Sequence, residues 1–279
     1  MLTTLFTNVT IHLLSIVVVV LLAVGIIDTL NKLNARLLHR VVGNHITLLI
    51  IGIGTMFHEL SHALFCLIFH HKIIEMNLLS YDPQAKSLGY VSHQWDKTSF
   101  YQSAGNFFIG LAPLFTGLVA YFLGNELFSG YGIATPSVVH TAAGTGVVYA
   151  DELPYMLMSM IHSVYRGMLQ LFVIGNLKNI WFYPYVLFSI TIAYAVAPSF
   201  SDLRGAFSGM LALIALIVLA NVVMHVLGIH STFLFDHLRK YTLTIVNAIG
   251  MLISCSACLL LLLVLISVSA KLFGYRNPG

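Results

Sequence analysis

The chain has 279 residues, of which 58% are hydrophobic and only 8% are charged, against about 25% charged in an ordinary soluble domain. Its net charge of +3 is small, and no basic patch interleaved with aromatic residues appears, which argues against a nucleic-acid partner. With a mean hydropathy of +0.91, the composition predicts an integral, multi-pass protein whose main surroundings are the lipid bilayer.

The first predicted element is an apolar helix at 11–27, which lacks a cleavage site and is therefore expected to be retained. A polar stretch follows at 28–45, in which basic residues recur every four positions. This stretch is interpreted either as a short helix at the lipid headgroups or as a solvated connector. The second apolar span covers about 46–69, long enough to cross a bilayer.

A change of periodicity after the second span predicts a β-hairpin between Ile73 and Gln94, with a turn at Asp82-Pro83. An added strand holds a peptide extended through main-chain hydrogen bonds, so the hairpin is a predicted platform for a peptide substrate. Asn77 and Leu79, on its first strand, are the predicted contact residues. The alternative interpretation is a polar surface loop.

The later segments complete a predicted bundle of six or seven transmembrane helices, the number depending on an amphipathic helix at 155–175. The further spans are predicted at 105–124, 181–198, 207–229 and 243–270, with a loop at 125–153. Pro113 falls in mid-span, where a proline is tolerated if neighbouring helices or a polar cavity satisfy the freed carbonyl. The predicted fold is therefore an all-α polytopic membrane protein with one short hairpin. With seven spans, and with Arg166 left out because it lies within a helix, lysine and arginine divide evenly between the two sides, so the positive-inside rule selects no orientation.

The second span contains His58-Glu59-Leu60-Ser61-His62. On a helix the two histidines lie about 40° apart on one face, one turn above the other, so that both can bind one metal ion. Glu59 is one step round, where its carboxylate can reach a water on that metal without being a ligand. This is the H-E-x-x-H arrangement of zinc hydrolases, in which zinc lowers the pKa of its bound water and the glutamate takes the proton. Roughly 0.01 such strings are expected by chance in this composition.

Two histidines and a water leave tetrahedral zinc one protein ligand short. Asp202 is the preferred candidate, because it follows a helix-ending proline at the junction of two spans. The alternative is that Asp202 pairs with Arg204 or caps the following helix. The other candidate ligands are Asp151, Glu152, His162 and His225.

From about Thr55 to Arg204, the sequence resembles the site-2 protease superfamily, the M50-type intramembrane zinc metalloproteases. The resemblance is carried by the Phe57–Ala63 motif, the hairpin-like segment after it and Leu111-Ala112-Pro113. It implies that Pro113 and Thr116 contact substrate, Thr116 occupying the place of a family asparagine, and that an aspartate at position 202 is the third zinc ligand. Leu203 stands where the family has a glycine.

The predicted function is intramembrane proteolysis: a zinc endopeptidase that cuts a substrate membrane protein in or near its transmembrane segment. The predicted domain is single, 1–279, with a catalytic core at 46–206 and flanking helices at 11–27 and 207–270. Two alternatives remain open. One is a zinc transporter or sensor with serial sites at residues such as His140, His162 and His225, and the other is a catalytically silent relative that binds membrane proteins.

Overall fold

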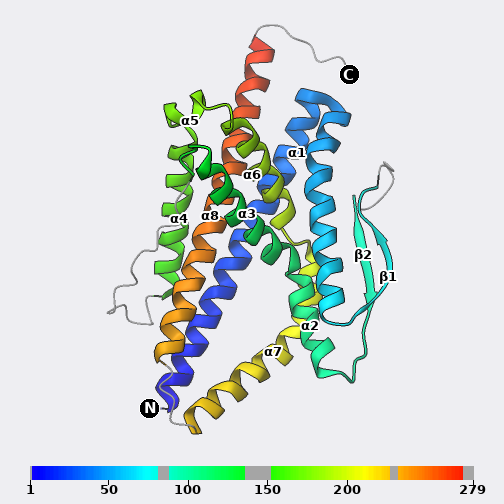
Figure 1. Ribbon diagram of the computed structural model, residues 1–279, viewed down its shortest axis with the longest axis vertical. Helices are drawn as coiled ribbons and strands as arrows, with labels where there is room; N and C mark the ends of the chain where they lie inside the picture. Colours follow the sequence, from blue (N-terminus) through cyan, green and yellow to red (C-terminus); the bar gives the residue numbers. More distant parts are fainter. Residues whose placement is uncertain (1, 81–87, 136–151, 227–231, 273–279) are drawn as a thin grey trace.

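The computed structural model describes residues 2–80, 88–135, 152–226 and 232–272, and these are mostly helical (Figure 1). The elements in chain order are α1 (Leu2–Ile68), β1 (Lys72–Asn77), β2 (Tyr90–Gln94), α2 (Phe100–Gly110), α3 (Ala112–Gly130), α4 (Glu152–Leu171), α5 (Ile174–Lys178), α6 (Phe182–Val196), α7 (Phe200–Val226) and α8 (Thr232–Leu272). The predicted helical class with one short hairpin is therefore confirmed.

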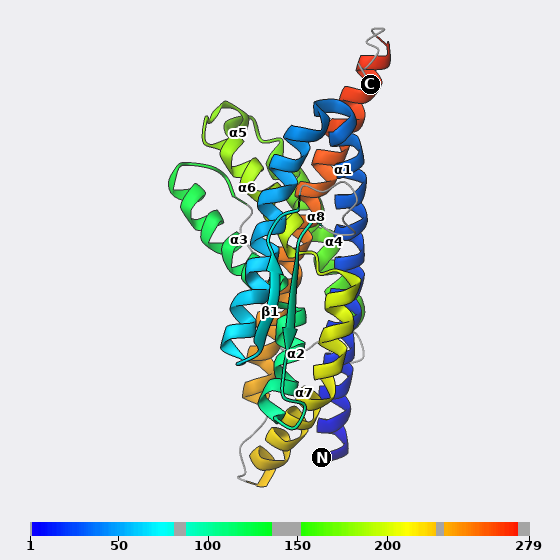
Figure 2. The same ribbon diagram turned by 90° about the vertical axis from the view of Figure 1, so that its right-hand side faces the viewer.

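Helix α1 is two arms joined at Gly43, whose backbone is non-helical at φ 78° and ψ 176°. A positive φ is a conformation that glycine adopts without a Cβ penalty. The second arm runs back alongside the first (Figures 1 and 2), so that Asp28 on one arm and Thr55 on the other line the same cavity. The arms form a helical hairpin that delivers the histidine motif into the bundle.

The polar stretch at 28–45 continues the first arm as helix, instead of forming a separate surface element. Its asparagines face the protein: the Nδ2 of Asn31 donates to the Ala193 carbonyl on α6 at 2.8 Å, and that of Asn34 donates to the Ser256 carbonyl on α8 at 2.9 Å. Buried amides are stable where they are hydrogen-bonded. The polarity of this stretch therefore reflects contacts between helices as well as exposure at its charged positions.

The largest apolar core lies where α1, α3, α4, α6 and α8 meet, and its fully buried members include Ile27, Tyr121 and Met156. Helix α4 contributes a buried stripe of Met156, Met160, Ser163, Gly167 and Leu171, and it packs along α8. The amphipathic segment predicted at 155–175 is thus a helix seated against the bundle. Its polar face, which includes His162 and Arg166, is exposed.

Two helix pairs are sharply bent at short breaks: α2 and α3 by 56° around Leu111, and α6 and α7 by 57° before Phe200. A proline lies at each break, Pro113 at the first and Pro198 at the second. Proline interrupts a helix because it lacks an N–H and disfavours helical geometry in the residue before it. Among the described residues, two helices are long and apolar enough to cross a membrane, or up to four if each bent pair is one span. The predicted six or seven spans are not reached by this count.

Strands β1 and β2 pair antiparallel, with Asn77 opposite Tyr90 and Ile73 opposite His93. The register shifts by one residue between Ile73 and Glu75. The strands of the predicted hairpin are thereby confirmed, while its predicted turn at 82–83 lies outside the described residues. The hairpin lies beside the second arm of α1 (Figure 1), with β2 next to the site described below.

Candidate metal centre

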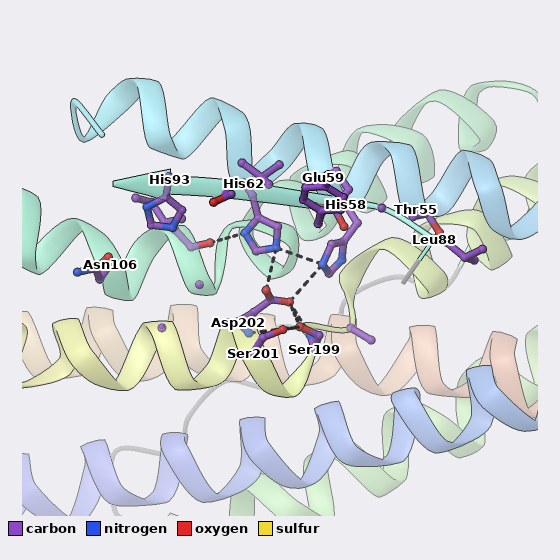
Figure 3. Close-up of a pocket in the computed structure, with 18 of the residues that line it drawn as sticks. Thr55, His58, Glu59, His62, Leu88, His93, Asn106, Ser199, Ser201 and Asp202 are labelled. Carbon is purple, nitrogen blue, oxygen red and sulfur yellow. Dashed lines mark hydrogen bonds and ion pairs between the residues drawn. The ribbon is translucent and has the colours of Figure 1, made fainter. Parts of the chain in front are cut away.

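Three side chains from two distant parts of the chain converge at the bends of the bundle (Figure 3). His58 and His62 come from the second arm of α1, and Asp202 comes from the first turn of α7. The Nε2 atoms of the two histidines are 3.1 Å apart, and each lies 3.4 Å from one oxygen of Asp202. Both histidine side chains are largely buried, at 12% and 8% exposure.

The orientation of His62 is fixed by a carbonyl that a proline leaves available. In a continuous helix, the N–H of residue 113 would bond to the carbonyl of residue 109, but Pro113 has no N–H. The Ile109 carbonyl instead accepts a hydrogen bond from Nδ1 of His62 at 2.7 Å. A carbonyl only accepts, so Nδ1 of His62 carries a proton, and in the neutral ring Nε2 presents its lone pair on the side of Asp202.

His58 is oriented in the same way by the second bend. Helix α6 ends at Val196, so the carbonyl of Ala195 lacks the donor that a further helical turn would supply. Nδ1 of His58 donates to this carbonyl at 2.8 Å, which leaves its Nε2 as an acceptor as well. Carbonyl partners of this kind orient metal-ligating histidines in general.

Asp202 is held by a reciprocal cap at the start of α7. Ser199 donates its backbone N–H and its hydroxyl to Oδ2 of Asp202, both at 2.6 Å, while its Oγ accepts from the Asp202 N–H at 3.2 Å. This is a capping box with aspartate in the third position. The cap and the approach to the histidines therefore coexist, whereas Arg204 stacks over the Phe200 ring.

The three side chains could hold one metal ion, because each offers one ligand atom and these atoms lie within 4.8 Å of one another. With zinc–ligand bonds of about 2.0–2.1 Å, two ligands of a tetrahedron are about 3.3 Å apart, and the two imidazole Nε2 atoms, 3.1 Å apart, are close to this spacing. Two imidazole lone pairs and a carboxylate that face one another repel unless a metal ion or a proton lies between them. Two imidazoles with one carboxylate are a donor set of catalytic zinc sites, which keep a fourth position open.

Glu59 lies one residue after His58 and is buried at 7% exposure, in the wall of a cavity of about 720 Å³ that also contains the three converging side chains. Gly89 covers Glu59 from the hairpin: a Cβ at Gly89 would approach Cγ of Glu59 to 2.8 Å. Glycine is thus required there for the strand to approach closely. The other wall of the cavity is the β2 region, Leu88, Gly89, Tyr90, Val91, Ser92 and His93.

The four predicted substrate contacts do not lie in this cavity lining. Pro113 is buried and bends the chain, and Thr116 pairs its Oγ1 with the Ser61 hydroxyl at 2.6 Å, joining α3 to the motif helix. The Oδ1 of Asn77 accepts from the Leu79 N–H at 3.1 Å, and Leu79 packs on Gly52. The sequence pattern shows which side chains of a strand share a face, because successive side chains point to opposite sides. It does not show which of the two strands lies next to the site, and in the structure this is the second strand.

The remaining ligand candidates do not join the cluster. Glu152 is buried in α4, and His162 lies in a separate groove on the exposed side of the same helix. Asp151 and His140 lie outside the described residues, as does the side chain of His225. Within the described part of the chain, His58, His62 and Asp202 form the one group that could hold a metal ion.

Sequence reasoning missed three residues of the cavity. Ser199 orients Asp202, and its serine-x-x-aspartate spacing was a readable capping signal. His93 and Asn106 also line the cavity, the amide of Asn106 being buried within α2. A polar amide inside an apolar span and a histidine inside a predicted strand were the available signals.

Comparisons of the chain with protein-family models, with curated proteins and with solved structures found no match. The chemistry of the site therefore has to be inferred from its own residues.

Proposed function

We propose that this chain is a multi-pass, membrane-embedded zinc endopeptidase of the site-2 protease type, which hydrolyses peptide bonds in or near transmembrane segments of other proteins. The observation that carries the proposal is the convergence of His58, His62 and Asp202, whose ligand atoms lie within 4.8 Å of one another and could hold one metal ion. Its second support is a buried glutamate beside them, in the position that H-E-x-x-H chemistry requires.

When bound, zinc supplies a Lewis acid that polarises a carbonyl and acidifies water. His58, His62 and Asp202 hold the ion, and the Ile109 and Ala195 carbonyls keep both imidazoles in the ligating tautomer. Glu59 takes a proton from the attacking water and returns it to the leaving amine, so that one carboxylate serves first as base and then as acid. The carboxylate of Asp202 lies between the two imidazoles, with one oxygen 3.4 Å from Nε2 of His58 and the other 3.4 Å from Nε2 of His62.

The substrate lies extended between β2 and the zinc ligands. Among the described residues β2 pairs with β1 on one edge and with no strand on the other, so that other edge can accept a third strand. A cavity of about 720 Å³ holds a peptide of a few residues. Strand addition straightens a helical substrate, which exposes the carbonyl that is to be cut.

The finer topology is also a proposal. If both arms of α1 cross the bilayer separately, and α6 and α7 do likewise, then these elements with the α2–α3 pair and α8 give six passages, or seven with α4. Reporter fusions after Gly279 and at Gln84 test this arrangement, since the two reporters must fall on sides consistent with that number. An accessibility pattern that fits only two to four passages would overturn it.

The described residues contain no second cluster of metal-binding side chains, and the transporter alternative therefore receives no support from them. A transport path needs several sites in series, and the described candidate His162 lies in a groove with apolar and aromatic neighbours. The silent alternative is weakened by the complete set of His58, Glu59, His62 and Asp202.

The deciding experiment has two readouts. The first is zinc per protein in detergent-purified wild type, His58→Ala, Asp202→Ala and Glu59→Gln after one chelator wash. We expect about one zinc in wild type and Glu59→Gln, and loss of zinc in the two ligand variants. No retained zinc in wild type would overturn the metal site.

The second readout is the set of new protein N-termini in membranes from cells that express wild type or Glu59→Gln. Cleavage products should appear only with wild type. Glu126→Gln is the matched control, because Glu126 is exposed on α3 and distant in sequence from the motif. Identical products with wild type and Glu59→Gln would refute the peptidase function while leaving the zinc site intact.

A further inference from the structure

A second cluster of rings lies against the cavity, at the base of the hairpin. His71 follows the end of α1, and His93 and Trp95 lie on and just after β2. The Nδ1 atoms of the two histidines are 3.0 Å apart, and the Trp95 ring stacks on His71 with centroids 5.8 Å apart and also contacts His93. His93 lines the cavity, and Figure 3 shows its ring beside that of His62.

The hydrogen bonds of this cluster fix which nitrogen of each ring carries the proton. Nε2 of His71 lies 2.9 Å from the Gln102 carbonyl, which only accepts, so this Nε2 is the donor. Nδ1 of neutral His71 is therefore an acceptor, and the facing Nδ1 of His93 must donate to it. It follows that Nε2 of His93 has no proton and is a hydrogen-bond acceptor.

Nε2 of His93 has no hydrogen-bond partner among the described residues. Burial, together with the neighbouring His71, lowers the pKa of His93 to about 4, and burial also lowers the pKa of His71. Both rings are therefore neutral at pH 7. His93 is half-buried in the cavity lining, so the neutral acceptor Nε2 is accessible to a hydrogen-bond donor on a molecule that occupies the cavity.

We propose that Nε2 of His93 accepts a hydrogen bond from a backbone N–H of the bound peptide, next to the bond that is cut. This inference rests on the proposed function. An extended peptide beside β2 presents N–H groups along its length, whatever its side chains are. His93 would thus be a substrate-binding residue that reads main chain and aligns the scissile carbonyl with the zinc ligands.

Two substitutions of His93 test the roles of its two ring nitrogens independently. The amide nitrogen of asparagine takes the place of Nδ1, so His93→Asn keeps the donor to His71 but removes the acceptor in the cavity. The amide of glutamine reaches the place of Nε2, so His93→Gln keeps an acceptor there and loses the link to His71. All variants are made with Trp181→Phe, so that Trp95 is the one remaining tryptophan and its fluorescence reports on the cavity.

The probes are N-acetyl-trileucine hydroxamate, the same peptide with methylated amide nitrogens, and acetohydroxamate, which binds zinc without a peptide. Their affinities are measured on the zinc-loaded, full-length protein. We expect His93→Asn to weaken the peptide hydroxamate about tenfold, the value of one hydrogen bond, and to leave the other two probes unchanged. His93→Gln should recover most of the affinity.

Equal affinity of wild type and His93→Asn for the peptide hydroxamate would overturn the inference. It would also be overturned if His93→Gln were the weaker variant, since the hairpin link would then matter and the acceptor would not. If acetohydroxamate fails to bind wild type, the zinc site itself fails and takes this inference with it. If acetohydroxamate binds wild type but His93→Asn does not change the affinity for the peptide hydroxamate, the zinc site is retained and only the contact of His93 with the peptide is refuted.

Discussion

Replacing Pro113 by alanine restores the N–H that the helix lacks at the α2–α3 bend. That N–H would compete with His62 for the Ile109 carbonyl and relax the 56° bend that holds this carbonyl in place. His62 would then lose the partner that fixes its tautomer. We expect Pro113→Ala to weaken zinc binding although residue 113 touches neither the metal nor the cavity.

The magnitude follows from the role of the lost contact. The His62–Ile109 hydrogen bond is short, at 2.7 Å, and it supports a buried ligand. Losing an outer partner of a ligating histidine typically costs about 10–100-fold in metal affinity, or about 1.4–2.7 kcal/mol. Because alanine favours helix far more than proline does, the thermal stability of the zinc-free protein should stay equal or rise. Zinc affinity and stability are thus expected to change in opposite directions.

Competition with a chromophoric chelator in detergent measures the zinc affinity, and thermal unfolding of the zinc-free protein measures the stability. Pro184→Ala is the matched control, since Pro184 lies in the first turn of α6, where N–H groups have no helical acceptor. A zinc Kd of Pro113→Ala within twofold of wild type would refute the role of the bend. Equal weakening in both proline variants would mean that the effect is general.

Three other predictions follow from the site. Ser199→Ala should weaken zinc binding about tenfold in the chelator competition, because it removes a 2.6 Å hydrogen bond to Asp202, while Ser201→Ala should not. Chelation should lower the Tm of wild type, since a zinc ion at the proposed site would join α1 to α7, and should leave the Tm of Asp202→Ala unchanged. Acidification should open the hairpin: the pKa of His93 is about 4 when folded and 6.5 ordinarily, so the open state binds more protons between these values. Docking is therefore full above about pH 6.5 and is lost toward pH 4, as hydrogen exchange of β1 and β2 would show, and His93→Asn should flatten this dependence.

Local periodicity was sufficient wherever the relevant residues are neighbours in the chain. The i, i+4 spacing of His58 and His62 places them on one helical face whatever the tertiary structure, and the alternation at 73–93 predicts paired strands. The mid-span proline was likewise informative, because the missing N–H four residues after Ile109 leaves that carbonyl able to accept from a side chain, here Nδ1 of His62. In the structure Pro113 lies outside the cavity lining, so the substrate contact that the family resemblance implies stays a prediction.

The sequence by itself thus determined the helical membrane class, the two-histidine motif with its glutamate, and a short list of third ligands headed by Asp202. The tertiary structure decided that Asp202 meets both histidines, because this contact spans about 140 residues and depends on how α7 leaves the second bend. It also decided that β2 faces the cavity, and not β1 with Asn77 or the segment after it with Leu79. Residue spacing fixes which side chains share a face, but only the packing of whole elements fixes what that face meets.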